Sequence, residues 1–208
     1  MIERSEVAGV LLAGGQARRM GGGDKCLRLI GGKPILAHII ERVRPQVTTL
    51  VLNANGDASR FDAFGLAVRA DSIDGFAGPL AGVLTGMDWA LDHAPHCKWI
   101  LTVPTDAPFL PVDLGDRLRE AVVAGSGDMA RASSGGRAHP VVGLWPVSLR
   151  QNLYAAMTEE DIRKVDRWTA AFTVCDVDFP VSPVDPFFNA NKPDDLARAE
   201  ELLKGIAG

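Results

Sequence analysis

Cysteine is scarce in this sequence of 208 residues. The three that occur, Cys26, Cys97 and Cys175, are odd in number and show no C-x-x-C spacing. Such a pattern supports neither a disulfide framework nor a zinc site, so we expect ordinary thiols. Lys25 directly precedes Cys26, and a neighbouring positive charge lowers a thiol pKa, although a small side chain that the fold simply tolerates is the commoner role.

Long apolar runs and broad basic regions are also missing. No stretch approaches the roughly 18 uncharged apolar residues of a membrane span, and residues 1–6 lack the basic region and apolar block of a secretory signal. The formal net charge is -4 and the isoelectric point is about 5.6, which argues against a nucleic-acid partner. We therefore expect a cytoplasmic protein with no membrane or nucleic-acid partner.

The composition is that of a globular chain, with 47% hydrophobic and 23% charged residues. The length fits a single domain over residues 1–208. Apolar runs alternate with helical patterns, which predicts an α/β, Rossmann-like fold with a mostly parallel central sheet and helices on both faces. The expected strands are 7–12, 50–52, 66–69, 99–103, 129–132, 141–144 and 172–177. The expected helices are 34–43, 80–91, 114–122, 148–157, 162–170 and 194–204.

The segment behind the first expected strand combines glycines with basic residues. It contains Leu12-Ala13-Gly14-Gly15, then Arg18-Arg19-Met20-Gly21, and then Asp24-Lys25. Glycine lets the backbone approach a ligand closely, and successive N–H groups form a nest for an anion. Residues 16–33 contain several basic residues and a single acidic one, Asp24, although the chain as a whole carries a net negative charge. The segment is typical of a polyphosphate site, with a merely flexible turn as the alternative.

Two common phosphate-binding patterns are excluded. A Walker A loop does not fit, because Lys25 follows Asp24 and Lys33 is followed by Pro34. The dinucleotide pattern G-x-G-x-x-G fails because the third glycine would have to replace Cys26. A nicotinamide-dependent dehydrogenase is therefore disfavoured.

Four candidate site residues each follow an expected strand: Gly14, Asn53, Asp71 and Asp106. Ligands of open α/β sheets bind outside the carboxyl ends of the strands, so these residues are expected to share one crevice. Asp106 lies in a proline-stiffened loop and is suited to hold Mg²⁺, which takes one or two carboxylates and completes its shell with phosphate oxygens and water. The alternative is an aspartate that shapes the turn.

The same residue types suggest how a nucleoside triphosphate is bound. The Asn53 amide both donates and accepts, and Asp71 can accept the two N–H donors that distinguish guanine from adenine. A turn asparagine and a strand-end aspartate are the alternatives. Lys25 is the best candidate to stabilise charge on departing pyrophosphate, and Arg19 is suited to a forked phosphate contact. Arg18 has a solvent-facing alternative.

The pattern L-A-G-G-x-x-x-R-M-G-x-x-D-K resembles the signature of nucleotidyltransferases, and within that superfamily the molybdenum cofactor guanylyltransferase family. The resemblance continues through most of the chain, at Asn53, Asp71, Gly78-Pro79-Leu80-Ala81-Gly82, Pro104-Thr105-Asp106-Ala107-Pro108 and Phe188-Asn189-Ala190-Asn191-Lys192-Pro193. It implies a fold of the nucleotide-diphospho-sugar transferase type, with nucleotide bound by the N-terminal half and acceptor by the C-terminal half.

The resemblance also implies an activity and its participants. The enzyme would transfer GMP from GTP to the terminal phosphate of Mo-molybdopterin with Mg²⁺, and would meet other molybdenum cofactor biosynthesis and recipient enzymes. Catalysis would rest on Lys25, Arg19 and Asp106, with Asp106 as the metal ligand. The residues expected around the nucleotide and metal are Leu12, Ala13, Gly14, Gly15, Lys25, Asn53, Asp71, Gly78, Asp106, Asn189 and Asn191.

Several alternatives stay open on the acceptor side and in the choice of base. A related cytidylyltransferase, a sugar-phosphate nucleotidyltransferase and an inactive nucleotide-binding regulator share the loop chemistry. The acceptor phosphate needs no general base, and the four histidines form no catalytic set; His139 either contacts the acceptor or shapes a turn. Trp145 and Trp168 either stack on a pterin or pack in the core. A basic acceptor pocket or a solvated face would use Arg131, Arg137, Arg163, Lys164 and Arg167.

Overall fold

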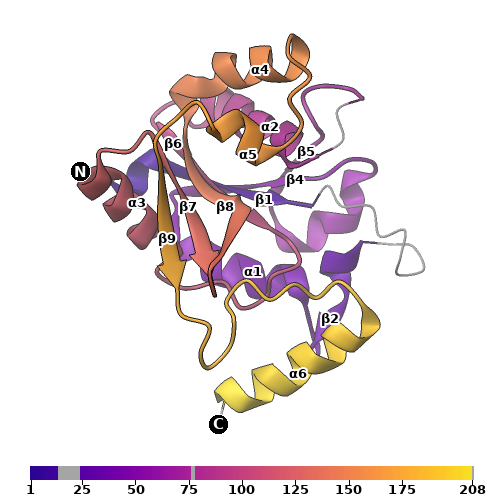
Figure 1. Cartoon of the computed structure of the whole chain (residues 1–208). Coiled ribbons are helices and arrows are strands. Elements are labelled where there is room, and N and C mark those ends of the chain that lie inside the picture. Colours follow the sequence, from indigo (N-terminus) through magenta and orange to yellow (C-terminus); the bar gives the residue numbers. More distant parts are fainter. Residues whose placement is uncertain (14–23, 76–77, 208) are drawn as a thin grey trace.

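A seven-stranded sheet runs through the molecule (Figure 1). The computed structural model of the chain describes residues 1–13, 24–75 and 78–207, with side chains up to residue 205. The strands follow the order β5-β4-β1-β6-β8-β7-β9, and within this sheet β8 alone runs against the others. Their bounds are β1 (Val7–Leu12), β4 (Thr49–Asn53), β5 (Ala67–Arg69), β6 (Trp99–Pro104), β7 (Met129–Ser134), β8 (Arg137–Pro146) and β9 (Val174–Phe179). The expected mostly parallel sheet is confirmed.

Helices cover both faces of this sheet, as expected. One face carries α1 (Ile35–Val43), α3 (Leu114–Gly125) and α6 (Pro193–Ala207), and the other carries α2 (Pro79–His93), α4 (Arg150–Thr158) and α5 (Val165–Thr169) (Figure 1). Within the described part of the chain, none of these helices has the length and apolarity that crossing a membrane demands.

Two hydrophobic cores, one on each face, follow from alternation along the central strands. In β1, Val7 and Leu11 belong to one core, whereas Ala8 and Val10 belong to the other. Successive side chains of a strand point to opposite faces, so a continuous apolar run fills both cores. Gly86 lets α2 lie close to β1, because a Cβ there would stand 2.5 Å from the Cγ2 atom of Val10.

The ends of several expected elements differ from the structure. Helix α1 begins at Ile35 because Pro34 pairs with Leu29 in a two-stranded hairpin of β2 (Leu29–Ile30) and β3 (Lys33–Pro34). The helix expected over residues 162–170 shortens to α5, because Asp161 has a φ of 50° and Lys164 is extended. The hairpin and the 3-10 helix η4 (Ala58–Phe64) have no counterpart among the expected elements.

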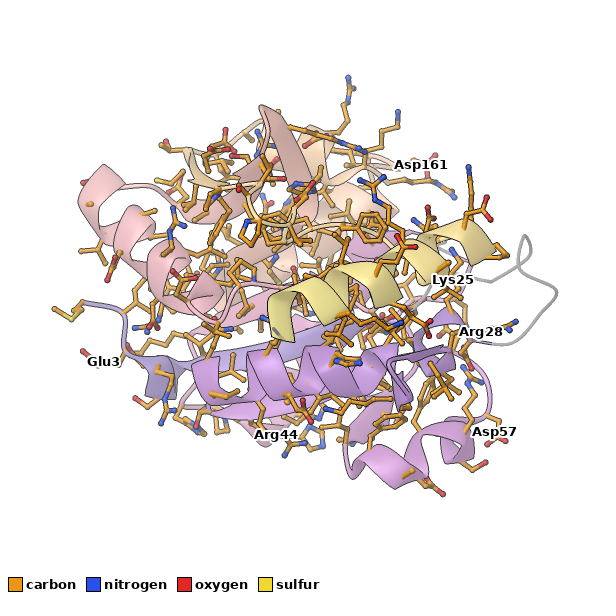
Figure 2. The ribbon with its side chains drawn as sticks, turned by 90° about the horizontal axis from the view of Figure 1, so that it is seen from below. Glu3, Lys25, Arg28, Arg44, Asp57 and Asp161 are labelled. Atoms are coloured by element: carbon orange, nitrogen blue, oxygen red, sulfur yellow. The ribbon has the colours of Figure 1, made fainter. Side chains whose placement is uncertain are left out.

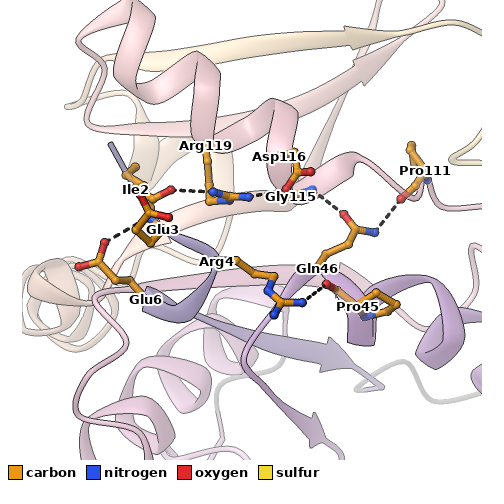
Figure 3. A network of polar contacts seen from close by, with 10 residues as sticks. All are labelled: Ile2, Glu3, Arg4, Glu6, Pro45, Gln46, Pro111, Gly115, Asp116 and Arg119. Carbon is orange, nitrogen blue, oxygen red and sulfur yellow. Dashed lines mark hydrogen bonds and ion pairs between the residues drawn. The ribbon is translucent and has the colours of Figure 1, made fainter.

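A network of polar contacts fixes the loop that follows β6 (Figure 3). The buried side chain of Gln46 donates to the carbonyl of Pro111 at 2.9 Å and accepts from the N–H of Gly115 at 2.7 Å. Arg42 donates to the carbonyl of Leu110 at 3.0 Å. Because buried polar groups are costly when unpaired, these bonds hold the far side of the loop that carries Asp106.

Candidate functional site

The carboxyl ends of β4, β1 and β6 lie side by side and bring the first site residues together. Leu12 stands opposite Asn53 in one neighbouring strand and opposite Pro104 in the other. The N–H of Ala13 donates to the carbonyl of Asn53 at 2.8 Å, and the N–H of Thr105 donates to the carbonyl of Leu12 at 3.3 Å. The backbone of residues 12 and 13 therefore lies at the centre of this edge, where a ligand of an open α/β sheet binds.

Part of the predicted glycine segment lies outside the residues that the structure describes. Gly14, Gly15, Arg18 and Arg19 lie among residues 14–23, which are not among the described residues. The expected roles of the two glycines in backbone contact and of Arg19 in phosphate contact remain predictions.

Asn53 and Asp71 are brought into direct contact. The Nδ2 of Asn53 donates to Oδ1 of Asp71 at 2.9 Å and to the carbonyl of Arg69 at 3.2 Å. Gly82 makes room for this arrangement, because a Cβ there would lie 2.5 Å from Oδ1 of Asn53. The buried Asn53 amide thus orients the half-buried Asp71, whose carboxylate keeps acceptor capacity for a ligand.

Asn55 is a member of this site that the sequence interpretation missed. Its Nδ2 donates to Oδ2 of Asp71 at 2.7 Å, while the backbone N–H of Asp71 donates to Oδ1 of Asn55 at 2.9 Å. The Asp71 carboxylate is therefore held from both oxygens. The signal was present in the spacing Asn53-x-Asn55 just after a strand, but only the pairing of β4 with β5 shows which carboxylate the second amide meets.

Gly78 stands immediately before α2 and close to a segment from the second half of the chain. Its φ is 143°, a conformation that L side chains rarely adopt, and a Cβ there would lie 3.5 Å from the carbonyl of Arg163. The N–H of Ser72 donates to Oγ1 of Thr85, in α2, at 2.9 Å. The start of a 15-residue helix therefore lies near the Asp71 end of the site, and its dipole favours an anion there.

Lys25, Asn191 and Asp106 come together from three distant parts of the sequence. The Nζ of Lys25 donates to Oδ1 of Asn191 at 2.8 Å, at the start of α6 (Figure 2). The N–H of Ala190 donates to the carbonyl of Asp106 at 2.9 Å. The exposed amide of Asn189 reaches Asp106, and exchange of its Oδ1 and Nδ2 positions lets Nδ2 donate to Oδ1 of Asp106 at 3.2 Å. Predicted site residues from the beginning, the middle and the end of the sequence thus lie close together.

The charge on Asp106 is poised between burial and a neighbouring cation. Burial raises the pKa of the Asp106 carboxyl above its usual range, and the positive charge of Lys25 lowers it. No group of three or more His, Cys, Asp or Glu side chains suited to a metal occurs among the described residues. A partly desolvated carboxylate fits a divalent cation that is held by one protein carboxylate and takes its other ligands from phosphate and water.

Cys26 is not an activated thiol. Burial raises its pKa to about 11, and the nearby negative charge of Asp24 acts in the same direction. The lowered pKa that Lys25 suggested is therefore wrong, because desolvation is the largest effect on the thiol. The alternative, a small side chain tolerated by the fold, fits the buried position.

Two features proposed for the acceptor side have structural partners instead. Arg131 forms ion pairs with Asp176 at 2.5 Å and with Asp166 at 2.8 Å. Trp145 and Trp168 are buried in the core on the α2 face, where their indole N–H groups donate to Thr102 and Asn152 respectively. The packing alternative therefore fits both tryptophans, and the charge of Arg131 is balanced within the protein.

His139 links the β7–β8 hairpin to the segment that carries Asn189 and Asn191. Its Nε2 lies 2.8 Å from Oγ of Ser134, which donates to Oδ1 of Asp185 at 2.9 Å. The serine proton is used on Asp185, so Nε2 of His139 is the donor to Ser134. Burial lowers the His139 pKa, and the ring packs 4.4 Å from that of Phe187. The histidine thus positions the segment.

Comparison with known proteins gives consistent results over nearly the whole chain. Residues 9–174 match the family model described as the MobA-like NTP transferase domain. The molybdenum cofactor guanylyltransferase of Bradyrhizobium sp. (strain ORS 278) is 57% identical over 94% of this chain and 92% of its own length.

Solved structures show the same fold. The molybdopterin-guanine dinucleotide biosynthesis protein A of Archaeoglobus fulgidus superposes with a TM-score of 0.72 and 23% identity, over 95% of this chain and 99% of that one. A protein of Mycobacterium tuberculosis H37Rv, solved in complex with manganese, superposes with a TM-score of 0.64 and 17% identity, over 94% of this chain and 98% of that one. The fold is of the nucleotide-diphospho-sugar transferase type, as expected.

Proposed function

The chain belongs to the MobA-like NTP transferase domain family, and we propose that it transfers GMP from GTP to the terminal phosphate of Mo-molybdopterin. The products are Mo-molybdopterin guanine dinucleotide and pyrophosphate. The observation that carries the proposal is the meeting of Lys25, Asn191 and Asp106 at the sheet edge that also holds the Asn53–Asp71 pair. The name of the Bradyrhizobium relative supports the same reaction.

The base end of the site is the Asp71 carboxylate. Asn53 and Asn55 each donate to one of its oxygens and hold it in place. A carboxylate has about four acceptor positions, so two remain for a ligand. Guanine presents the N1–H and N2–H₂ donors to such an acceptor, whereas adenine carries an acceptor at N1. The arrangement therefore favours guanine.

The phosphate end combines backbone and cations. The backbone of Leu12 and Ala13 lies at the carboxyl end of β1 and borders the nucleotide in the proposal, and the backbone N–H groups of Gly14 and Gly15, which follow in the sequence, are expected to contact phosphate. Lys25 stabilises the charge that develops on pyrophosphate, and Arg19 adds a forked contact. Positioning and electrostatic stabilisation supply most of the catalysis in phosphoryl transfer.

A divalent cation, Mg²⁺ in the proposal, would be held by Asp106, with Asn189 beside it and Gly78 on the nucleotide side. Such an ion neutralises phosphate charge and orients the triphosphate. Burial disfavours the charged form of Asp106, and the positive charge of Lys25 favours it. A bound cation would likewise stabilise the ionised carboxylate.

The transfer itself needs no general base. An oxygen of the acceptor phosphate, ionised at neutral pH, forms a bond to the α-phosphorus of GTP. The bond from that phosphorus to the oxygen bridging to the β-phosphate breaks, and pyrophosphate leaves with the electron pair. The N-terminal half binds nucleotide and the C-terminal half binds acceptor in this proposal. A cytoplasmic location and contact with molybdenum cofactor biosynthesis and recipient enzymes remain predictions.

Turnover with each of the four nucleoside triphosphates tests the proposal. With Mo-molybdopterin and Mg²⁺ present, GTP should support pyrophosphate release and formation of the dinucleotide product far better than ATP, CTP or UTP. Equal or better turnover with CTP would overturn the assignment in favour of a cytidylyltransferase. No turnover with any of them would favour a binding protein without catalysis.

A further inference from the structure

Arg60 contacts both ends of the nucleotide site, although it belongs to neither. It lies in η4, and its Nε forms an ion pair with Oδ2 of Asp24 at 2.5 Å. Its Nη2 donates to the backbone carbonyl of Asn55 at 2.6 Å. One guanidinium group therefore touches the residue before Lys25 and the residue that holds Asp71.

These contacts complete a continuous chain across the site. Asn55 and Asp71 exchange two hydrogen bonds, at 2.7 and 2.9 Å. Asp24 directly precedes Lys25, whose Nζ is bonded to Asn191. Arg60 therefore connects the two ends, through direct contacts with Asp24 and Asn55 and through the peptide bond that joins Asp24 to Lys25.

Neighbouring residues hold the Arg60 side chain in the orientation that makes these two contacts. Phe61 is fully buried and anchors η4 in the core, and Asp57 accepts from the N–H of Ser59 at 3.0 Å at the start of that helix. The guanidinium lies against the backbone of Gly56, where a Cβ would stand 3.0 Å from Nη1 and where φ is 85°. A planar, rigid fork suits two contacts in different directions better than a flexible ammonium group does.

We propose that Arg60 is a positioning residue that sets the spacing between the phosphate end and the base end of the nucleotide site. The inference rests on the proposed function, because it takes Lys25 as a phosphate ligand and Asp71 as the guanine acceptor. Arg60 acts through Asp24 on one side and through Asn55 on the other. Both phosphate affinity and guanine preference therefore depend on this one side chain.

Binding measurements on the full chain separate the two ends without an acceptor. Isothermal titration calorimetry with Mg²⁺ gives dissociation constants for GTP, for ITP, which lacks the 2-amino group of guanine, and for pyrophosphate. Asp24→Asn should weaken all three by a similar factor and keep the preference for GTP over ITP. Asn55→Ala should lower that preference and leave pyrophosphate binding unchanged.

Arg60→Leu should produce both defects at once. We expect about 10-fold weaker pyrophosphate binding from the lost ion pair with Asp24, and a similar loss of preference for GTP over ITP from the lost hydrogen bond to Asn55. Adding Asp24→Asn to Arg60→Leu should cause no further loss of pyrophosphate affinity, because both substitutions break the same contact. Arg60→Lys should recover pyrophosphate binding only, since one ammonium group cannot serve both partners.

Arg44→Leu is the matched control, because it removes the same charge at an exposed position far from Lys25 (Figure 2). It should bind all three ligands as the wild type does. Wild-type values for Arg60→Leu, or losses that multiply in the double variant, would overturn the role of Arg60. If Arg60→Leu does not fold, Arg60→Lys and Asn55→Ala decide by the same criteria. A wild-type chain that does not bind GTP would instead refute the proposed function.

Discussion

Lys25 donates a 2.8 Å hydrogen bond from Nζ to Oδ1 of Asn191, a residue 166 positions later in the chain. This bond places the cation that follows the glycine segment against the segment that begins α6. Asp106 lies close enough that the charge of Lys25 lowers its pKa against the opposing effect of burial. The cation, the carboxylate and the amide from the C-terminal segment therefore act as one unit.

Replacing Lys25 by Met should lower kcat for pyrophosphate release by about 10²–10³-fold, as for the loss of one preorganised electrostatic group. Asn191→Ala should lower it by about 10-fold, because the cation remains but loses its positioning partner. Lys98→Met removes a surface lysine paired with Glu6 and should leave the rate unchanged. An assay coupled through inorganic pyrophosphatase measures pyrophosphate release by all three variants. A wild-type rate for Asn191→Ala would contradict a positioning role.

Asp106→Asn should abolish transfer, keep GTP affinity largely intact and raise the melting temperature of the ligand-free protein. The pKa of Asp106 is higher in the folded protein than in the unfolded chain. The folded state therefore loses stability as the pH rises from the unfolded pKa through the folded pKa, and this cost persists at higher pH. The neutral amide removes this cost at pH 7. Each kcal/mol recovered should raise the melting temperature by about 2–4 °C in a chain of this size.

Differential scanning calorimetry at pH 4 and pH 7 checks this sign. The stabilising effect of Asp106→Asn should be larger at pH 7 than at pH 4, where more of the wild-type carboxyl is protonated. Asp113→Asn, an exposed position in the same loop, is the control. A variant that is less stable than the wild type at pH 7 would show that the charge of Asp106 stabilises the empty site.

Gly82→Ala should destabilise the fold and weaken GTP binding together. Its Cβ would lie 2.5 Å from Oδ1 of Asn53 and 2.6 Å from Cδ2 of Leu12, two residues that shape the site. Overpacking of this kind costs about 1–3 kcal/mol. Gly205→Ala, in α6 with open space around it, should instead stabilise by up to about 1 kcal/mol. Urea denaturation measures the free energy of unfolding of both variants. Equal changes would show that α2 shifts to accommodate the added methyl group without the cost of overpacking.

Cys26 should resist alkylation in the folded protein at pH 7 to 8. Its pKa of about 11 means that the thiol, not the reactive thiolate, is present at these pH values. Iodoacetamide labelling followed by peptide mass spectrometry should show slow modification of Cys26 that becomes fast in denaturant. Labelling of native Cys26 as fast as in the unfolded chain would contradict the buried, protonated thiol.

The strands and most helices were predictable because their signals are local. Apolar runs at Val7–Leu12 and Trp99–Pro104 bury both faces of a strand, and the apolar spacing of Ile35–Val43 is that of one helix face. The 3-10 helix η4 and the β2–β3 hairpin escaped because they are short and carry no such period. Arg60 contacts Asp24 from η4, so this support of the site was harder to foresee than the sheet.

The sheet, its helical layers and the positions of Asn53, Asp71 and Asp106 after strands follow from the sequence, because hydrophobic periodicity and strand length act over a few neighbouring residues. The contacts within the site come from the three-dimensional arrangement: Asn55 with Asp71, Arg60 with Asp24, and Lys25 with Asn191. Such contacts depend on which strands lie side by side and on how far each side chain reaches. Desolvation is equally non-local, and for that reason burial rather than the adjacent lysine sets the pKa of Cys26.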